Sequence, residues 1–228
     1  MGNFSPCHNR PVEILYRDEA LAVLAKPSGL LVHRGWDDDA EVAVTLARLA
    51  LGKFVYPVHR LDRGASGALV FALSSEVAAA LHTAFEDGRV EKRYLAAVRG
   101  IAPDAVTIDH PIPRREDGPR VPAVTRVRRL ATAGFFSLVE AVPLTGRLHQ
   151  VRRHLKHISH PILGDANYGK GALNRQLRDE HGLARLALHA ASVRFDHPLT
   201  GVPIEVTAAL PADLVAPLTR LALWPHSG

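Results

Sequence analysis

The sequence predicts one α+β domain, and three observations carry this prediction. Apolar runs with strand composition are interleaved with a few amphipathic stretches of helical period. No segment repeats at a fixed period, and no low-complexity linker divides the 228 residues. With 47% hydrophobic and 22% charged residues, a chain of this length can bury a core. We therefore expect a flexible polar leader over residues 1–10 and a folded domain over residues 11–228.

The N-terminal part of the domain is expected to hold a hairpin and then a helix. Strands over residues 12–16 and 21–25 flank acidic turn residues, which indicates a hairpin. The chain is then expected to be extended over residues 30–33. It enters a helix over residues 41–51, and Gly52 is expected to end that helix.

A buried strand followed by an amphipathic helix is the clearest pair of elements. Residues 68–73 are all apolar and are bounded by a glycine and two serines, which is typical of a buried strand. Either Ser74 or Ser75 can cap the next helix, and Gly88 can end it. One face of this helix is expected to carry, at four-residue spacing, Val77, Leu81 and Phe85.

The rest of the chain is expected to alternate strands and helices around one exposed, proline-rich connection over residues 104–122. Residues 183–193 are apolar and fit either a helix or a strand. The other expected elements are strands over 93–99, 135–142 and 202–206 and helices over 148–159 and 211–223.

Composition limits the location and the chemistry of the protein. No apolar stretch approaches the ~20 residues that cross a bilayer, and the first residues do not form a secretory signal, so we expect a cytoplasmic protein. The one cysteine, Cys7, excludes a disulfide within the chain and a cysteine-rich zinc module. Residues 114–156 hold ten Lys or Arg against three acidic residues, a net charge of +7 in a chain of +5. Such a segment suits RNA or DNA, although a solvated arginine-rich face would have the same composition.

An unusual group of charges precedes the buried strand, in the segment HRLDRGASG at residues 59–67. Asp62 lies between Arg60 and Arg63, and cations at this distance lower the pKa of a carboxyl and keep it ionised. An ionised aspartate beside a glycine-rich turn favours a nucleophile over a proton donor. An ordinary surface ion pair would give the same pattern.

A second group of donors lies in TGRLHQVRRHL at residues 145–155. In a helix, spacings of three and four bring His149, Arg152 and Arg153 together, where they suit phosphates and a carboxylate partner. A helix with a solvated cationic side is the alternative. Tyr94, at the start of an expected strand, either stacks on a base or packs half-buried like many strand tyrosines.

Two further patterns are weaker. Residues 164–170 read GDANYGK, which satisfies the spacing of a P-loop, but Gly171 stands where a Ser or Thr would hold Mg²⁺. Several histidines and an aspartate of this region do not form a recognised ligand motif, so no metal is expected; they are His149, His154, His157, His160 and Asp165.

Six segments in a fixed order together resemble the RluA family of pseudouridine synthases, from about Glu13 to Ala209. They are KPSGLLVHR at 26–34, HRLDRGASG at 59–67, EKRYLAAVRG at 91–100, TGRLHQVRRHL at 145–155, HPILGDANYG at 160–169 and LALHA at 186–190. The resemblance implies one catalytic domain with a mixed, largely antiparallel central sheet flanked by helices and loops. It also implies that no S4-like RNA-binding module is present.

The resemblance implies that a uridine in structured RNA is isomerised to pseudouridine without a cofactor. Asp62 is implied as the nucleophile, which attacks either the ribose C1′ or the pyrimidine ring. Arg152 would pair with Asp62 and keep it ionised. Tyr94 would stack on the uracil and help to remove the C5 proton, and Leu188 would form an apolar wall on the other face of the ring.

RNA contacts and substrate choice are implied in the same way. Arg60 would fill the space that the target base leaves, and Arg129, Arg147 and His149 would hold RNA. The acidic loop at 37–39 either shapes substrate choice or is merely solvated. Within the family the chain is most similar to members that modify tRNA, at position sixty-five, so we expect tRNA as the partner and a monomeric enzyme. The alternatives are a ribosomal RNA synthase of the same family, a catalytically silent RNA-binding protein and a metal-dependent hydrolase.

Overall fold

The computed structural model describes residues 12–33, 42–113 and 118–224. The predictions for residues 1–10 and 37–39 fall outside them. In chain order the elements are β1 (Ile14–Arg17), β2 (Leu21–Lys26), α1 (Ala43–Leu51), β3 (Tyr56–Pro57), β4 (Ser66–Ala72), α2 (Ser75–Glu86), β5 (Glu91–Arg99), β6 (Ala105–Asp109), β7 (Ile112–Pro113), β8 (Arg120–Val121), β9 (Val124–Ala133), β10 (Phe136–Pro143), α3 (Gln150–His157), α4 (Gly171–His181), β11 (Leu188–Asp196), β12 (Pro203–Thr207) and α5 (Ala212–Arg220).

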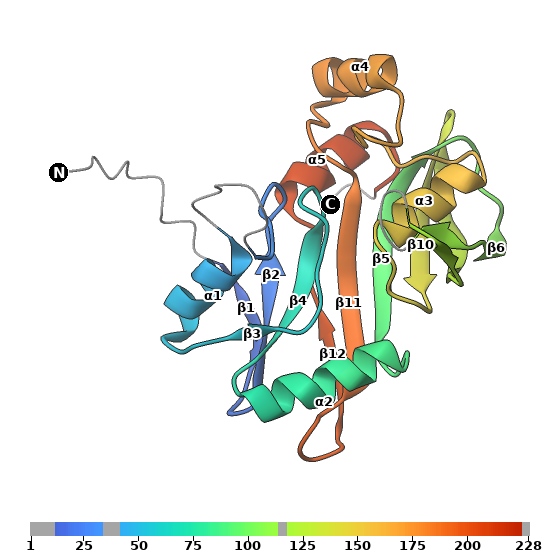
Figure 1. Cartoon of the computed structure of the whole chain (residues 1–228). Coiled ribbons are helices and arrows are strands. Elements are labelled where there is room, and N and C mark those ends of the chain that lie inside the picture. The colour runs from blue at the N-terminus through green and yellow to red at the C-terminus, as the bar shows by residue number, and fades with distance from the viewer. Residues whose placement is uncertain (1–11, 34–41, 114–117, 225–228) are drawn as a thin grey trace.

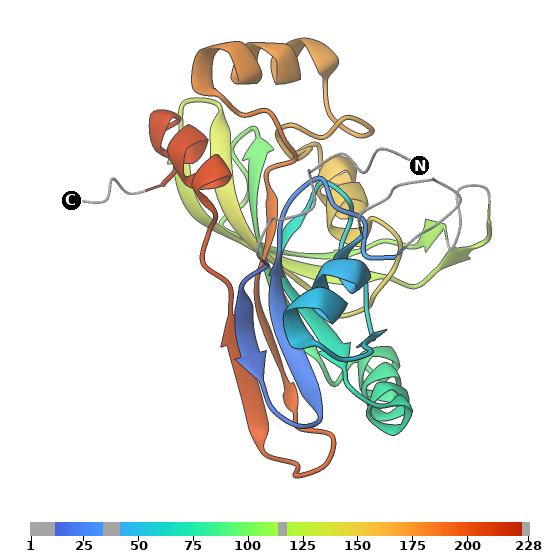
Figure 2. The ribbon, with the colours of Figure 1, turned by 90° about the vertical axis from the view of Figure 1, so that its left-hand side faces the viewer.

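One ten-stranded sheet organises the molecule. Its strands follow the order β1-β2-β4-β11-β5-β10-β9-β6, with β12 beside β11 and β3 beside β4, while β7 and β8 form a separate hairpin (Figure 1). Among the described residues, β4 and β11 form the one parallel pair of named strands, and the other pairs are antiparallel. The views agree that α4 and α2 lie toward opposite ends of these strands (Figures 1 and 2). The prediction of a mixed, largely antiparallel sheet flanked by helices is therefore confirmed.

Several local predictions are confirmed at the residues that carry them. Strands β1 and β2 form the expected antiparallel hairpin. Helix α1 ends at Gly52, which adopts a left-handed conformation with φ of 64°. Helix α2 begins after Ser74, whose side-chain oxygen accepts a hydrogen bond from the Val77 N–H. Glycine and serine therefore act here through the conformation and the hydrogen bond that make them common at helix ends.

The stretch from residue 104 to residue 133 differs most from the prediction. The prediction of an exposed connection over 104–122 is wrong in part, because the segment contains β6 of the main sheet and the β7–β8 hairpin. Strand β9 is absent from the prediction. Along β9, Val127 is buried between exposed Arg126 and Arg128, so apolar and charged side chains alternate as a half-buried strand requires. The several arginines of this segment made the two-residue alternation of buried and exposed side chains hard to recognise in the sequence.

Three other segments correct or complete the prediction. Residues 30–33 do not form a strand but a bend with one isolated bridge, from Leu31 to Val42. Helix α4 was not predicted, and its one buried residue, Leu177, leaves it without the apolar face that identifies a helix in a sequence. The ambiguous segment over 183–193 becomes strand at its C-terminal part, in β11.

Strand β4 is buried on both faces, and this explains its uninterrupted apolar sequence. Leu69 and Phe71 belong to the cluster of buried residues that includes α1. Ala68, Val70 and Ala72 point the other way, into the cluster that includes α2. Successive side chains of a strand leave opposite faces, so α1 and α2 can cover the two sides of the same strand.

The parallel contact between β4 and β11 depends on a glycine. Gly67 has φ of 116°, and a Cβ at this position would lie 2.2 Å from the carbonyl oxygen of Ala190. Only glycine allows the two backbones to approach so closely. This contact places the loop before β4 next to the beginning of β11, where the site described below is formed. No helix in the described part of the chain is long and apolar enough to cross a membrane.

Candidate active site

A cavity of about 860 Å³ is formed by parts of the chain that are far apart in the sequence. The loop before β4, the end of α2, strand β5, the start of β11 and the segment from β10 into α3 all contribute to its wall. The fold brings nearly all of the predicted site residues together there. The cavity is lined by every one of them except Arg129, namely Arg60, Asp62, Tyr94, Arg147, His149, Arg152 and Leu188.

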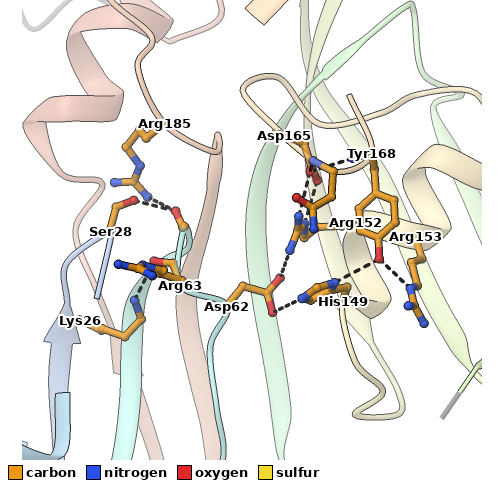
Figure 3. A network of polar contacts seen from close by, with 12 residues as sticks. Lys26, Ser28, Asp62, Arg63, His149, Arg152, Arg153, Asp165, Tyr168 and Arg185 are labelled. Atoms are coloured by element: carbon orange, nitrogen blue, oxygen red, sulfur yellow. Dashed lines mark hydrogen bonds and ion pairs between the residues drawn. The ribbon is translucent and has the colours of Figure 1, made fainter. Parts of the chain in front are cut away.

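The Asp62 carboxylate faces two side chains from the start of α3, those of Arg152 and His149 (Figure 3). Arg152 Nη1 donates a hydrogen bond to Asp62 Oδ2 at 3.2 Å, and His149 Nε2 lies 3.8 Å from Asp62 Oδ1. The carboxylate remains open to the cavity, with 17% of its side chain exposed. This guanidinium comes from 90 residues along the chain, and its hydrogen bond to Asp62 is the contact that the family resemblance implied for Arg152. The adjacent Arg63 donates from Nε to the carbonyl of Gly29.

Arg152 joins Asp62 to a second carboxylate, that of Asp165. Its Nε and Nη2 each donate to Asp165 at 2.8 Å, which leaves Nη1 for Asp62. Asp165 is buried and also accepts the backbone N–H groups of Asn167 and Tyr168. Burial alone would raise the pKa of Asp165, but the hydrogen bonds from Arg152 and the backbone outweigh it and lower the pKa. This two-point contact fixes the guanidinium plane, so Nη1 is directed at Asp62 before any ligand binds.

His149 adopts a backbone conformation that residues other than glycine rarely take. Its φ is 54° and its ψ is 29°, a conformation that costs about 1–2 kcal/mol. Its Nδ1 lies 3.1 Å from the Tyr168 hydroxyl, which also accepts a hydrogen bond from Arg153 Nε at 2.9 Å. Burial lowers the pKa of His149, and the opposing charge of Asp62 does not restore it. A neutral imidazole therefore lies beside Asp62, and Arg152 supplies the positive charge.

Buried Lys26 stabilises the loop that carries Asp62. The Lys26 ammonium donates to the carbonyl oxygens of Pro27, Leu30 and Arg63 at 2.9, 2.7 and 3.4 Å. These are three acceptors for the three protons of an ammonium. Burial lowers the pKa of Lys26 to about 7. Its contacts fasten the turn after β2 to the loop, and Figure 3 shows this group of residues on the other side of Asp62 from α3.

Arg185 connects the same loop to β4 and β11. Its Nη2 donates to the hydroxyl of Ser66 at 2.8 Å and to the carbonyls of Gly64 and Leu188 at 3.3 Å each. Its Nη1 donates to Asp213 of α5 at 2.9 Å. One buried side chain thus fixes the spacing between the Asp62 loop and the start of β11, where Leu188 enters the cavity.

Tyr94 and Leu188 provide the apolar surfaces of the cavity near Asp62. Tyr94 projects from β5 and Leu188 begins β11, and both line the cavity. Burial raises the pKa of Tyr94, and the nearby charge of Asp62 raises it further. The phenol therefore stays protonated at neutral pH. This state suits stacking on a base, and any part in proton removal starts from a neutral hydroxyl.

The predicted RNA-contacting arginines have different surroundings. Arg60 and Arg147 line the cavity with exposed side chains. Arg129 lies outside the cavity on β9, where it forms an ion pair with Asp104 and donates to the carbonyl of Ala102 at 2.6 Å. The structure therefore brings Arg60 and Arg147 to the site but not Arg129.

The residues of the weak metal pattern are held in separate contacts. His154 Nε2 lies 2.9 Å from the carbonyl of His110, and His160 Nδ1 lies 3.0 Å from the carbonyl of Arg99. Asp165 is occupied by an arginine, as described above. Across residues 12–33, 42–113 and 118–224, no three His, Cys, Asp or Glu residues gather in a way that could hold a metal ion.

Sequence reasoning missed three side chains that shape the site. It considered Asp165 only as a metal ligand, and it did not single out Tyr168 or Arg185. Asp165 and Tyr168 belong to the HPILGDANYG segment of the family resemblance, so this segment could have drawn attention to them. The sequence does not indicate which side chains they contact. Arg185 has no local pattern around it that indicates burial.

Comparisons with known proteins indicate the family to which the chain belongs. The family model described as RNA pseudouridylate synthase matches residues 20–157. A tRNA pseudouridine synthase C from Vibrio cholerae is 40% identical over 222 residues, covering 87% of this chain and 91% of that protein. One from Haemophilus ducreyi is 42% identical over 221 residues, with the same two coverages. The solved structure of human RNA pseudouridylate synthase domain containing 4 aligns with a TM-score of 0.75 at 29% identity, covering 92% of this chain and 93% of that one.

Proposed function

The chain belongs to the RNA pseudouridylate synthase family, and on that premise we propose that it isomerises a uridine of tRNA to pseudouridine. The observation that supports this most strongly is the ion pair inside the cavity, where Arg152 holds Asp62 beside the ring of Tyr94. The choice of tRNA rests on the printed names of the similar proteins. The catalytic domain in this proposal spans residues 11–228.

The proposed reaction is an isomerisation, so the substrate and the product have the same atomic composition. The bond from N1 to the ribose C1′ breaks, the uracil turns, and a bond forms from C5 to C1′. C5 loses its proton and N1 gains one. Asp62 acts as the nucleophile, at C1′ or at the ring, and Arg152 keeps it ionised and oriented. The bond that Asp62 forms to the uridine breaks again before the product leaves, so the carboxylate is regenerated. Removal of Arg152 would leave the carboxylate partly buried and without its cation.

The other residues bind and position the RNA in this proposal. Tyr94 stacks on the uracil and assists proton removal at C5, and Leu188 covers the other face of the ring. Arg60 enters the space that the flipped base leaves, which offsets part of the cost of unstacking. Phosphates are held at the cavity by Arg147 and outside it by Arg129, and His149 contacts the RNA as a neutral imidazole. The enzyme acts as a cytoplasmic monomer without a cofactor, a part of the proposal that rests on the sequence and on the family resemblance.

The decisive experiment follows tritium released from C5 of uridine into water, because this isomerisation expels the C5 hydrogen. We expect the wild type to release label from tRNA. The Asp62→Asn variant should be slower by several orders of magnitude while its affinity for RNA is retained, because phosphate contacts are separate from the nucleophile. Asp179→Asn, the same substitution at an exposed position on α4, is the matched control and should behave as wild type.

The other outcomes would each correct a defined part of the proposal. Release from ribosomal RNA alone would keep the chemistry and replace the substrate. Release at the wild-type rate by Asp62→Asn would remove the nucleophile assignment. No release from either RNA, together with tight RNA binding, would identify a silent RNA-binding protein.

A further inference from the structure

Part of the cavity wall, beside the end of α2, contains a lysine that the proposed chemistry does not use. Lys92 lies two residues before Tyr94 on β5, so both side chains leave the same face of the strand, and both line the cavity. The wall continues through Phe85 of α2 and Gly146 of the segment after β10. At about 860 Å³ the cavity is near the top of the ~300–1,000 Å³ range of ligand pockets, so it has room for more than a uracil ring.

The Lys92 ammonium has no acidic partner among the described residues. Its nearest recorded neighbours are uncharged: the Phe85 ring centroid lies 5.7 Å from Nζ, and a Cβ at Gly146 would lie 3.9 Å from it. Glu86 and Asp87 also line the cavity, but neither forms an ion pair with Lys92, and Asp87 is engaged by a neighbouring arginine. The positive charge of this lysine is thus not neutralised within the described part of the protein.

The histidine beside Lys92 does not share its charge. His59 stacks on Phe85 with ring centroids 4.6 Å apart, and its Nε2 accepts the backbone N–H of Val70 at 3.0 Å. Burial lowers the pKa of His59 to about 3, so it is neutral. Burial lowers the pKa of Lys92 to about 8, so most Lys92 side chains remain protonated at neutral pH. A partly buried cation without a partner is costly, and a bound anion would relieve that cost.

We propose that Lys92 binds a phosphate of the RNA strand next to the target nucleotide. The inference rests on the proposed function, because the anions that an RNA substrate brings to this cavity are its backbone phosphates. A flipped nucleotide carries its flanking phosphates toward the pocket that receives its base. An ammonium suits such a contact as a point charge, whereas the guanidinium of Arg152 is already committed to two carboxylates.

The test compares Lys92→Met and Lys92→Arg with Lys53→Met in their binding to fluorescently labelled tRNA over a range of salt concentrations. Lys53 is exposed after α1 and does not line the cavity, so it controls for the loss of one positive charge. Lys92→Met should weaken binding about tenfold at low salt. It should also reduce the slope of log affinity against log salt by roughly 0.7–0.9, the change expected for one lost phosphate contact. Lys92→Arg and Lys53→Met should keep the wild-type slope.

Turnover measurements and a folding control complete the test. For Lys92→Met, KM for tRNA should rise while kcat at saturating RNA stays within about twofold of wild type, because a phosphate contact acts before and after the reaction alike. An unchanged salt slope would overturn the proposal, as would a lower kcat with unchanged KM, which would place Lys92 on the base. Thermal unfolding checks each variant, and Lys92→Gln replaces Lys92→Met if the latter is unfolded. The binding arm needs no turnover, so it can fail or succeed independently of tritium release.

Discussion

The arginines of α3 and those of β9 come from one basic segment of the sequence, yet the fold treats them differently. The Arg152 side chain is 9% exposed and is joined to the completely buried carboxylate of Asp165. On β9, Arg128 is 61% exposed, and Arg129 pairs with Asp104, whose side chain is 87% exposed. Both groups consist of arginines from the same charged segment, but the ion pair of α3 is buried whereas those of β9 are exposed to solvent.

This difference shows that a net charge of +7 over a segment does not describe one free patch. Part of the charge is internal and positions Asp62, part is balanced by surface carboxylates, and part, as at Arg147, lines the cavity. Breaking a buried ion pair leaves a charge without solvent or partner, whereas breaking an exposed pair returns both groups to water. The two arginine groups should therefore respond to substitution on different scales.

The largest effect should follow from Asp165→Asn. This change removes the charge that fixes Arg152 in two directions, and loss of one partner of a buried pair typically costs about 3–5 kcal/mol of unfolding free energy. A slightly misplaced Arg152 no longer orients Asp62, so kcat should fall by roughly 100-fold. KM for tRNA should change little, because Asp165 is buried and does not line the cavity. Urea unfolding and steady-state tritium release measure the two effects.

Asp104→Asn is the matched control, since it makes the same substitution in the exposed pair between Arg129 and Asp104. It should change unfolding free energy by less than about 1 kcal/mol and leave kcat unchanged. Equal losses in the two variants would mean that burial does not separate the pairs. A loss of stability in Asp165→Asn without any loss of kcat would restrict Asp165 to a structural role.

The same distinction explains what the sequence could predict of the site. Asp62, Tyr94 and Arg152 were found because each lies in a short segment whose residue types are unusual together, and a resemblance linked those segments. The partnership of Arg152 with Asp165 was not found, because the contact depends on how the loop after α3 folds back on the helix. Local composition placed Arg60 and Arg63 beside Asp62, whereas the guanidinium that donates to Asp62 comes from α3, as the resemblance implied.

The fold was predictable where burial imposes a pattern on the sequence. Strand β4 and helix α2 have long apolar faces, and their boundaries agree with the predicted ones to within a few residues. Strand β9 and helix α4 lack that signal, since the first alternates arginine with apolar residues and the second buries little besides Leu177. A sequence pattern therefore identifies an element reliably only where that element buries a continuous apolar face.

The dependence of stability on pH gives a further test of the buried pair between Arg152 and Asp165. The pKa of Asp165 is below its usual 3.8, so its contribution is fully present above that pH and is lost as the pH falls through the lower folded value. Buried His154 and His189 also have lowered pKa values, so stability falls below about pH 6.5 in wild type and variant alike. The difference in unfolding free energy between wild type and Asp165→Asn should therefore not narrow from pH 7 to 5, because loss of Asp165 can only lower the pKa of His149 further, and it should narrow below pH 4. A difference that narrowed already between pH 7 and 5 would contradict the assignment.

The smallest effect on stability is expected for Arg129, which belongs to the exposed pair on β9. Arg129→Ala should cost less than about 1 kcal/mol of unfolding free energy, and this cost should vanish in high salt, which screens exposed pairs. It should weaken tRNA binding only two- to threefold, because Asp104 already offsets the charge. Arg126→Ala, which removes a neighbouring arginine with no recorded partner among the described residues, should weaken binding more and lower the salt slope by nearly one. Two results would contradict this explanation. One is that Arg129→Ala loses as much unfolding free energy as Asp165→Asn, and the other is that it loses more tRNA affinity than Arg126→Ala. In either case solvent exposure would not account for the different effects of the arginines.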